Sequence, residues 1–191
     1  MNDTMITELA LRARSGDGDA ATEFIRQTYA QVWRVLVVLS SRGVAEDLTQ
    51  ETFARAIRSL PTFRAESSAR AWLLSIARRV AADHLRTAAR RPKTDSRSEF
   101  DEAMVVAPDS SEMVVLRALV ARLEDDRRLA FVLTQMLGLS YTEAAEVCRC
   151  PIGTIRSRVA RARDDLATAL AEHKSGEQRW QERVVAPAYA W

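Results

Sequence analysis

The stretch from Cys150 to Leu166, CPIGTIRSRVARARDDL, constrains the fold more than any other part of the chain. Its apolar side chains recur at helical spacing, which at about 100° per residue places them on one narrow stripe. The opposite side has Ser157 and Ala160 at its centre and arginines around them. Such a helix packs on a core through one side and leaves a positive side to solvent. The apolar stripe consists of Ile155, Val159, Ala162 and Leu166.

A shorter helix is predicted immediately before this one. Ser140, with Glu143 three residues later, has the spacing of a capping box, which satisfies the first backbone N–H groups of a helix. Pro151 then stands at a first helical position, where its missing N–H costs nothing. A short helix, a tight turn and a longer basic helix together indicate a helix-turn-helix. On the basic helix alone, an ordinary solvated arginine-rich helix is the alternative, because arginine is a good helix former.

The rest of the chain also shows helical spacing, and no strand pattern persists anywhere. The first group of predicted helices ends at Pro92, and its fourth helix starts from a cap at Ser67 or Ser68. Asp19 is the expected cap of the second helix. These helices are predicted over residues 4–14, 19–41, 45–60 and 68–90.

A second helical group follows a stretch, 92–110, that lacks helical period and contains two prolines, as flexible linkers do. Its helices are predicted over 112–123, 126–137, 141–148 and 151–171, and no clear period follows. The expected fold is therefore all-α, with two small helical domains on a flexible linker. The division is a first domain 1–91, a linker 92–110, a second domain 111–171 and a tail 172–191.

Composition narrows the class of protein further. Hydrophobic residues make up 47% and charged residues 28%, which fits a globular chain and not a disordered one. We expect a cytoplasmic protein with no membrane partner, because there is no bilayer-length apolar run and no signal peptide. Cys148 and Cys150 are expected to be ordinary thiols, since His84 and His173 are too distant to complete a metal site. Without a glycine-rich phosphate loop or a plausible triad, we expect no enzyme and no cofactor.

Two surfaces of the first domain stand out. One side of the helix in DLTQETFARAIRSL carries Asp47, Glu51 and Arg58, with Gln50 beside them. The alternative to a binding face is that these acids only favour the start of the helix through its dipole. In the next helix, Trp72 heads a row of arginines beside a polar loop, an arrangement that suits single-stranded nucleic acid. Trp72 as an ordinary core residue is the alternative there.

Three collinear stretches resemble the extracytoplasmic-function group of sigma factors of bacterial RNA polymerase. They are DLTQETFARAIRSLPTFR (47–64), ARAWLLSIARRVAADHLR (69–86) and GLSYTEAAEVCRCPIGTIRSRVARARDDL (138–166). The Arg128-Leu129-Ala130-Phe131 sequence also matches the Arg-x-x-Phe entry into the second domain of that family. The family often has Asn where this chain has Arg79, so the −10 sequence preference does not carry over. A stand-alone helix-turn-helix regulator is the competing interpretation, but it leaves residues 45–90 unexplained.

The resemblance implies that the first domain is sigma region 2 and the second is sigma region 4. It implies core RNA polymerase (the clamp of the β′ subunit and the β subunit) and promoter DNA as partners, and members are often held by an anti-sigma factor. It implies core contacts by Asp47, Gln50, Glu51 and Arg58. It implies −10 element contacts by Phe63, Arg64, Ser67, Trp72, Arg79 and Arg86. It implies −35 element contacts by Arg156, Ser157, Ala160 and Arg161, with Thr154, Arg158 and Arg128 near phosphates.

Overall fold

The computed structural model describes residues 3–89, 115 and 118–185, with side chains described up to residue 173. Every regular element within these ranges is helical, as the sequence predicts. The linker 92–110 lies outside the described residues, as do residues 112–114, 116 and 117 of the helix predicted over 112–123. Residues 115 and 118–121 of that prediction are helical. Within the described ranges, no helix has the combination of length and apolar character needed to cross a membrane.

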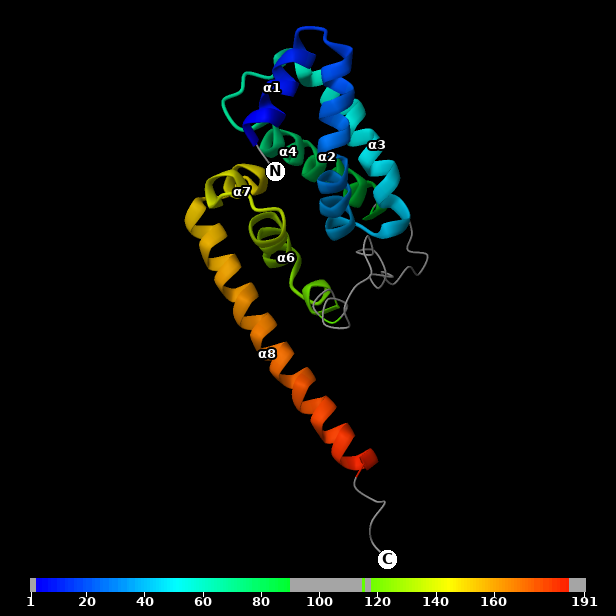
Figure 1. The fold of residues 1–191 in the computed structure, drawn as a ribbon, viewed down its shortest axis with the longest axis vertical. Coiled ribbons are helices and arrows are strands. Elements are labelled where there is room, and N and C mark those ends of the chain that lie inside the picture. Colours follow the sequence, from blue (N-terminus) through cyan, green and yellow to red (C-terminus); the bar gives the residue numbers. More distant parts are fainter. Residues whose placement is uncertain (1–2, 90–114, 116–117, 186–191) are drawn as a thin grey trace, which may run out of the picture.

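The first domain is a bundle of four helices around an apolar core (Figure 1). Phe24, Leu36, Leu73 and Leu74 are fully buried at its centre. Ser68 caps the fourth helix, because its Oγ accepts a hydrogen bond from the backbone N–H of Ala71 at 3.2 Å. The elements are α1 (Asp3–Arg14), α2 (Gly18–Leu39), α3 (Arg42–Ser59), the 3₁₀ turn η1 (Leu60–Thr62) and α4 (Ala69–Ala89).

Two helix starts in this domain differ from the prediction. The cap of α2 is Asp17 and not Asp19, since the Asp17 carboxylate accepts from the backbone N–H of Ala20 at 2.9 Å. The glycine at position 18 does not delay the helix, because this cap satisfies one of its first donors. Helix α3 begins at Arg42, three residues earlier than expected, and includes Gly43.

The second domain consists of α6 (Asp125–Phe131), the π-helical turn η2 (Val132–Met136), α7 (Tyr141–Cys148) and α8 (Ile152–Val185). The single helix predicted over 126–137 is therefore wrong in its second half, where the hydrogen bonding widens to a π turn. Helix α8 also extends to Val185, beyond the predicted end at 171, and projects away from the other helices (Figure 1).

The turn between α7 and α8 follows the predicted chemistry. Both bonds of the Ser140–Glu143 capping box are present at the start of α7. Arg149 ends α7 in the left-handed region, with φ of 52°, and the N–H of Cys150 bonds to the carbonyl of Ala145 at 3.1 Å. The chain then enters α8 directly after Pro151, which completes the helix-turn-helix.

The two domains pack directly against each other. Helix α7 lies on α4, and α6 lies on α2, as Figure 1 shows for the yellow and green helices. The buried apolar residues of both domains form one continuous cluster. Part of the α4 surface is therefore covered by the helix-turn-helix.

Candidate nucleic-acid and polymerase interfaces

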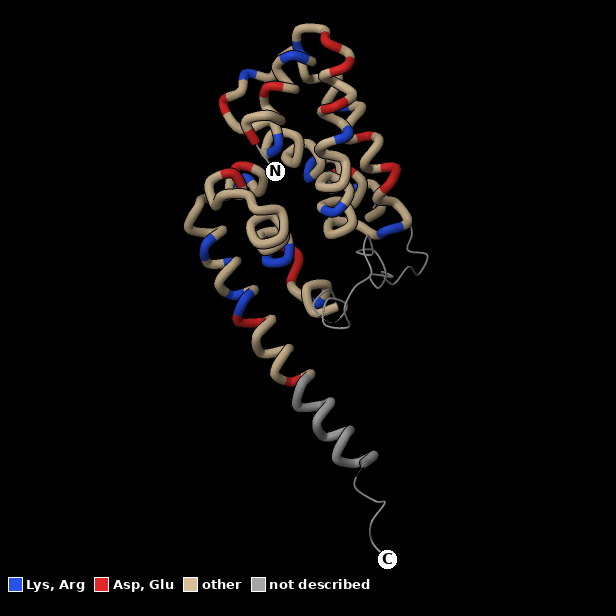
Figure 2. The backbone as a smooth tube through the Cα atoms, viewed as in Figure 1, with Lys and Arg blue, Asp and Glu red and all other residues tan. Residues whose placement is uncertain are grey.

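Helix α8 presents the predicted −35 face to solvent. Ile155 and Val159 are buried at 0% and 1% exposure, so the helical phase predicted from the sequence is confirmed. The basic positions lie along the half of α8 nearest α7 (Figure 2). Thr154 is half-buried at the margin of this face. Its exposed residues are Arg156, Ser157, Ala160 and Arg161.

Arg158 and Arg128 are bonded within the second domain, away from this exposed face. The Arg158 guanidinium pairs with Asp126 and lies 3.7 Å from Cys150 Sγ through Nη1. Arg128 is buried, donating to the carbonyl of Ala121 at 2.8 Å and pairing with Asp125 at 2.6 Å. Burial lowers the pKa of Arg128, and the nearby carboxylates partly oppose this. Phosphate contacts by these two arginines stay a prediction from the resemblance.

The predicted polymerase face lies on α3. Asp47, Gln50 and Arg58 are exposed, and Glu51 is half-buried beside them. Glu51 Oε1 accepts from Arg55 Nε at 2.7 Å and lies 3.8 Å from Arg58 Nη2. The helical spacing places the four predicted residues on one side, as expected.

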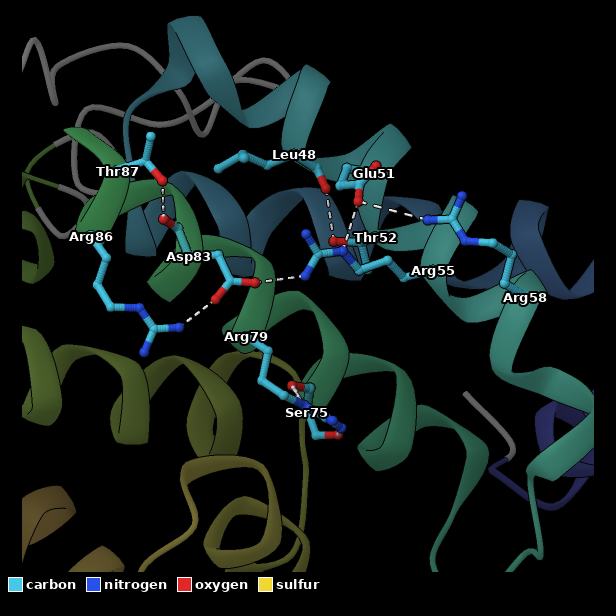
Figure 3. Close-up of polar contacts among 10 residues, drawn as sticks. All are labelled: Leu48, Glu51, Thr52, Arg55, Arg58, Ser75, Arg79, Asp83, Arg86 and Thr87. Carbon is cyan, nitrogen blue, oxygen red and sulfur yellow. Dashed lines mark hydrogen bonds and ion pairs between the residues drawn. The ribbon is translucent and has the colours of Figure 1, made fainter. Parts of the chain in front are cut away.

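An ion-pair network, which sequence reasoning missed, joins α3 to α4. Arg55 Nη1 donates to Asp83 Oδ2 at 2.7 Å, and the other oxygen of Asp83 accepts from Arg86 (Figure 3). The pair of Arg55 with Glu51 is visible in the sequence as an i,i+4 spacing. The pair with Asp83 depends on how the two helices pack, which no local pattern shows.

The loop before α4 places the two predicted aromatic residues against each other. Phe63 is buried, and its ring centroid lies 4.9 Å from that of Trp72, which is half-buried against the core. Arg14 Nη1 fixes the loop by donating to the carbonyl of Phe63 at 2.9 Å. Phe63 therefore supports Trp72 from within and presents little surface of its own, whereas Arg64 is exposed and Ser67 half-buried.

Arg79 lies on the exposed side of α4, one turn before Asp83. It donates to the carbonyl and hydroxyl oxygens of Ser75 at 3.2 and 3.1 Å (Figure 3). Burial, and then the charge of Arg149 on the second domain, lower the pKa of Arg79. Arg79, a predicted −10 contact of the first domain, thus lies within electrostatic range of the helix-turn-helix turn.

A polar junction between the domains also escaped the sequence prediction. Ser68 Oγ donates to Glu143 Oε1 at 2.6 Å, while Glu143 Oε2 accepts from the backbone of Ser140. Burial works to raise the pKa of Glu143, but the bonds from Ser68 and Ser140 outweigh it and leave the pKa below its ordinary value.

Arg70 is the buried cation of the same junction. Only 5% of the residue is exposed, and Nη1 donates to the carbonyl of Leu137 at 3.1 Å. Its Nε lies 3.0 Å from Asp3 Oδ1 on α1. Burial raises the pKa of Asp3, and the charge of Arg70 opposes that shift. One guanidinium therefore contacts α1 and the second domain at once.

The two cysteines differ in their surroundings. Cys148 is buried on α7, and burial, with a smaller effect of Cys150, raises its pKa to about 11. Cys150 is half-buried in a shallow hollow lined by Thr142, Ala145 and Ile152 among others. Both thiols are free, and within the described part of the chain no three His, Cys, Asp or Glu side chains gather as metal ligands do.

Known proteins resemble this chain in sequence and in architecture. The model of sigma-70 region 2 matches residues 24–91, and that of sigma-70 region 4 matches residues 113–166. The ECF RNA polymerase sigma factor SigC of Mycobacterium tuberculosis is 51% identical over 169 residues, covering 86% of this chain and 91% of that protein. The RNA polymerase sigma-H factor of Pseudomonas aeruginosa is 38% identical over 178 residues, covering 85% and 92%.

A solved structure agrees with this grouping. The sigma factor RpoE of Bartonella quintana, determined in complex with the anti-sigma factor NepR, aligns with a TM-score of 0.69 and 29% identity, covering 78% of this chain and 96% of that one. The helical phase predicted for α8 is confirmed, and each domain matches a region of the sigma-70 family. These findings agree on one family. The chain belongs to the extracytoplasmic-function group of the sigma-70 family of RNA polymerase sigma factors.

Proposed function

We propose that each domain contributes a separate contact to the initiation of transcription, which is the function of this family of sigma factors. The observation that carries the proposal is the exposed side of α8, where Arg156 and Arg161 lie beside the small side chains of Ser157 and Ala160. Arginine donates two hydrogen bonds to guanine, and alanine contacts a thymine methyl in the major groove. This side reads the −35 element.

The first domain contacts polymerase and the −10 element. The exposed acids Asp47 and Glu51 suit a positively charged partner surface, with Gln50 and Arg58 at its margin. On α4 and its preceding loop, exposed Arg64, Arg79 and Arg86 follow a DNA backbone, and the half-buried ring of Trp72 offers a stacking surface to an unpaired base. Phe63 and Ser67 support this loop.

Arg158 and Arg128 receive a structural role in this proposal. Arg158 holds α6 and the turn before α8 together through Asp126 and Cys150. Arg128 binds the carbonyl groups near the start of α6. Both therefore orient the helix-turn-helix that carries the −35 face.

Binding to core polymerase tests the division of labour. We expect the double substitution Asp47→Arg with Glu51→Arg to weaken capture of core polymerase, because like charges then face each other. The fold should survive, since both side chains reach solvent. Capture of core at wild-type strength would contradict the proposed α3 contact, and duplex binding without any core binding would favour the stand-alone regulator.

An anti-sigma factor is proposed as a further partner, on the likeness to RpoE, whose structure contains one. The protein would act in the cytoplasm, where polymerase and promoter are found. Purification of the tagged chain from its own cells, followed by identification of stoichiometric partners, tests both statements. Recovery of core polymerase subunits alone would remove the anti-sigma factor from the account.

A further inference from the structure

We infer that Arg55 is a positioning residue that controls how strongly Arg86 is available to promoter DNA, an inference that rests on the proposed function of α4. Arg55 belongs to α3, next to the polymerase face, and sequence analysis gave it no role. Its Nε donates to Glu51 Oε1 and its Nη1 to Asp83 Oδ2, both at 2.7 Å. Figure 3 shows the bond with Glu51 within α3 and the bond with Asp83 crossing from α3 to α4.

The carboxylate of Asp83 binds one arginine from each of the two helices. One oxygen accepts from Arg55 and the other from Arg86, the residue expected to follow the DNA backbone. Hydrogen bonds from Arg55 and then from Arg86 lower the pKa of Asp83, so it is a carboxylate at neutral pH. A carboxylate at this place holds Arg86 back and repels phosphate, and Arg55 reduces both effects by neutralising part of its charge.

Arg79 gives the contrast within the same helix. It lies four residues before Asp83, yet its hydrogen bonds in the described structure go to Ser75. Asp83 therefore forms a hydrogen bond with Arg86, whereas its charge reaches Arg79 only at longer range and partly opposes the lowering of the Arg79 pKa. The side chains of Arg55 and Asp83 are 39% and 43% exposed, so each pair is strong enough to orient a side chain and weak enough to exchange for DNA.

The polymerase face joins the same network through Glu51. That carboxylate shares Arg55 with Asp83 and lies near Arg58 as well. A cation of polymerase that neutralises Glu51 weakens its attraction for Arg55, so the charge of Arg55 acts more fully on Asp83. Asp83 then holds Arg86 less strongly, and binding of polymerase makes Arg86 more available to phosphate.

The experiment measures the affinity of the holoenzyme, assembled from core polymerase and each sigma variant, for a fluorescent promoter duplex. Arg55→Gln should weaken promoter binding about threefold, the fold-change expected from one partly exposed ion pair. Asp83→Asn should remove the effect, so that Arg55→Gln with Asp83→Asn binds as Asp83→Asn does. The threefold loss should also shrink at higher salt, because it arises from charge.

Arg26→Gln is the matched control, because Arg26 forms an exposed pair with Glu23 on α2, with Nη2 and Oε1 2.6 Å apart, outside the network. It should alter neither promoter affinity nor its salt dependence. Core affinity and the melting temperature are measured for every variant. Core affinity should change by a smaller factor than promoter affinity, and the melting temperature should change little.

Several results would overturn the inference. A threefold loss that persists in the Asp83→Asn background would show that Arg55 acts through another residue, and a loss of core affinity alone would make it a direct polymerase contact. An Arg86→Ala holoenzyme with wild-type promoter affinity would remove the DNA contact of Arg86 together with the inference. A wild-type holoenzyme without promoter preference would instead contradict the proposed function itself.

Discussion

Arg156 and Arg161 stand on the exposed side of α8, with their guanidinium groups facing solvent. We expect Arg156→Ala or Arg161→Ala to cost about 1–3 kcal/mol on the preferred −35 sequence and to flatten the preference at one base position. A bidentate arginine–guanine contact explains this magnitude. Binding of the full holoenzyme to single-base −35 variants measures it. Uniform weakening across all variants would contradict base reading and leave only phosphate contact.

Arg158 leads to a different expectation, although it belongs to the same helix. Its pair with Asp126 links α8 to α6, so Arg158→Ala should lower the free energy of unfolding by about 1 kcal/mol and leave base preference intact. Asp126→Asn should produce a similar loss, and the double substitution little more. If Arg158→Ala instead reduces the salt dependence of DNA binding by one phosphate contact without lowering stability, the phosphate role predicted from the sequence is right.

The cysteines offer a second test at this scale. A thiol reagent at pH 8 should modify Cys150 in the folded protein and leave Cys148 unreacted, because Cys148 is buried and its pKa is raised to about 11. Cys148→Ala should therefore react like wild type, and Cys150→Ala should react only after unfolding. Rapid reaction of both thiols in the folded protein would show that α7 opens far more readily than its packing indicates.

At the scale of the element, α7 depends on its capping box. Ser140→Ala should destabilise the protein by about 1 kcal/mol, the usual loss for a capping side chain. The −35 affinity should fall with it, because α7 sets the turn into α8. Thermal unfolding and −35 binding are the two measurements, and Ser157→Ala serves as the stability control on the exposed side of α8. Equal stability of Ser140→Ala and Ser157→Ala would contradict the assigned cap.

Local spacing predicted the helices and the capping box of α7, although it misplaced the cap of α2 and the start of α3 by a few residues, and contacts between elements were not predictable. The stripe of Ile155 and Val159 and the pair Ser140–Glu143 are local, so their structure follows from residues a few positions apart. The π turn after Phe131 shifts hydrogen bonds without changing the apolar pattern. The partners of Arg70 and Asp83 come from other helices, and so no spacing in the sequence indicates them.

At the scale of the whole molecule, the contact between the domains should depend on pH. Since the pKa of Glu143 is held below its ordinary value of 4.5, its contribution is fully present above that value and is lost as pH falls through the lowered pKa. Small-angle scattering should show wild type expanding in this range. Glu143→Gln, which keeps a capping residue at the same place, should lack this step. Expansion of both proteins at the same pH would contradict a role for the Glu143 carboxylate in closure.

The contact between the domains also affects whether the two predicted DNA-binding surfaces can act together. Helix α7 covers part of α4 and accepts a hydrogen bond from Ser68 beside the predicted −10 loop, while the predicted −35 side of α8 stays exposed. The proposed function requires the domains to separate before both surfaces contact one promoter, because α7 is bonded to Ser68, next to the predicted −10 residue Ser67. Core polymerase, by binding α3, is the partner expected to hold the domains apart.

Transcription by core polymerase with this protein is the measurement that tests the account most directly. On a template with the preferred −35 and −10 elements, the account predicts specific initiation that requires this chain, declines with Arg156→Ala through the −35 element, and declines with Asp47→Arg and Glu51→Arg through loss of core binding. Specific binding of the chain to duplex DNA, with no change in where core polymerase begins transcription, would contradict it.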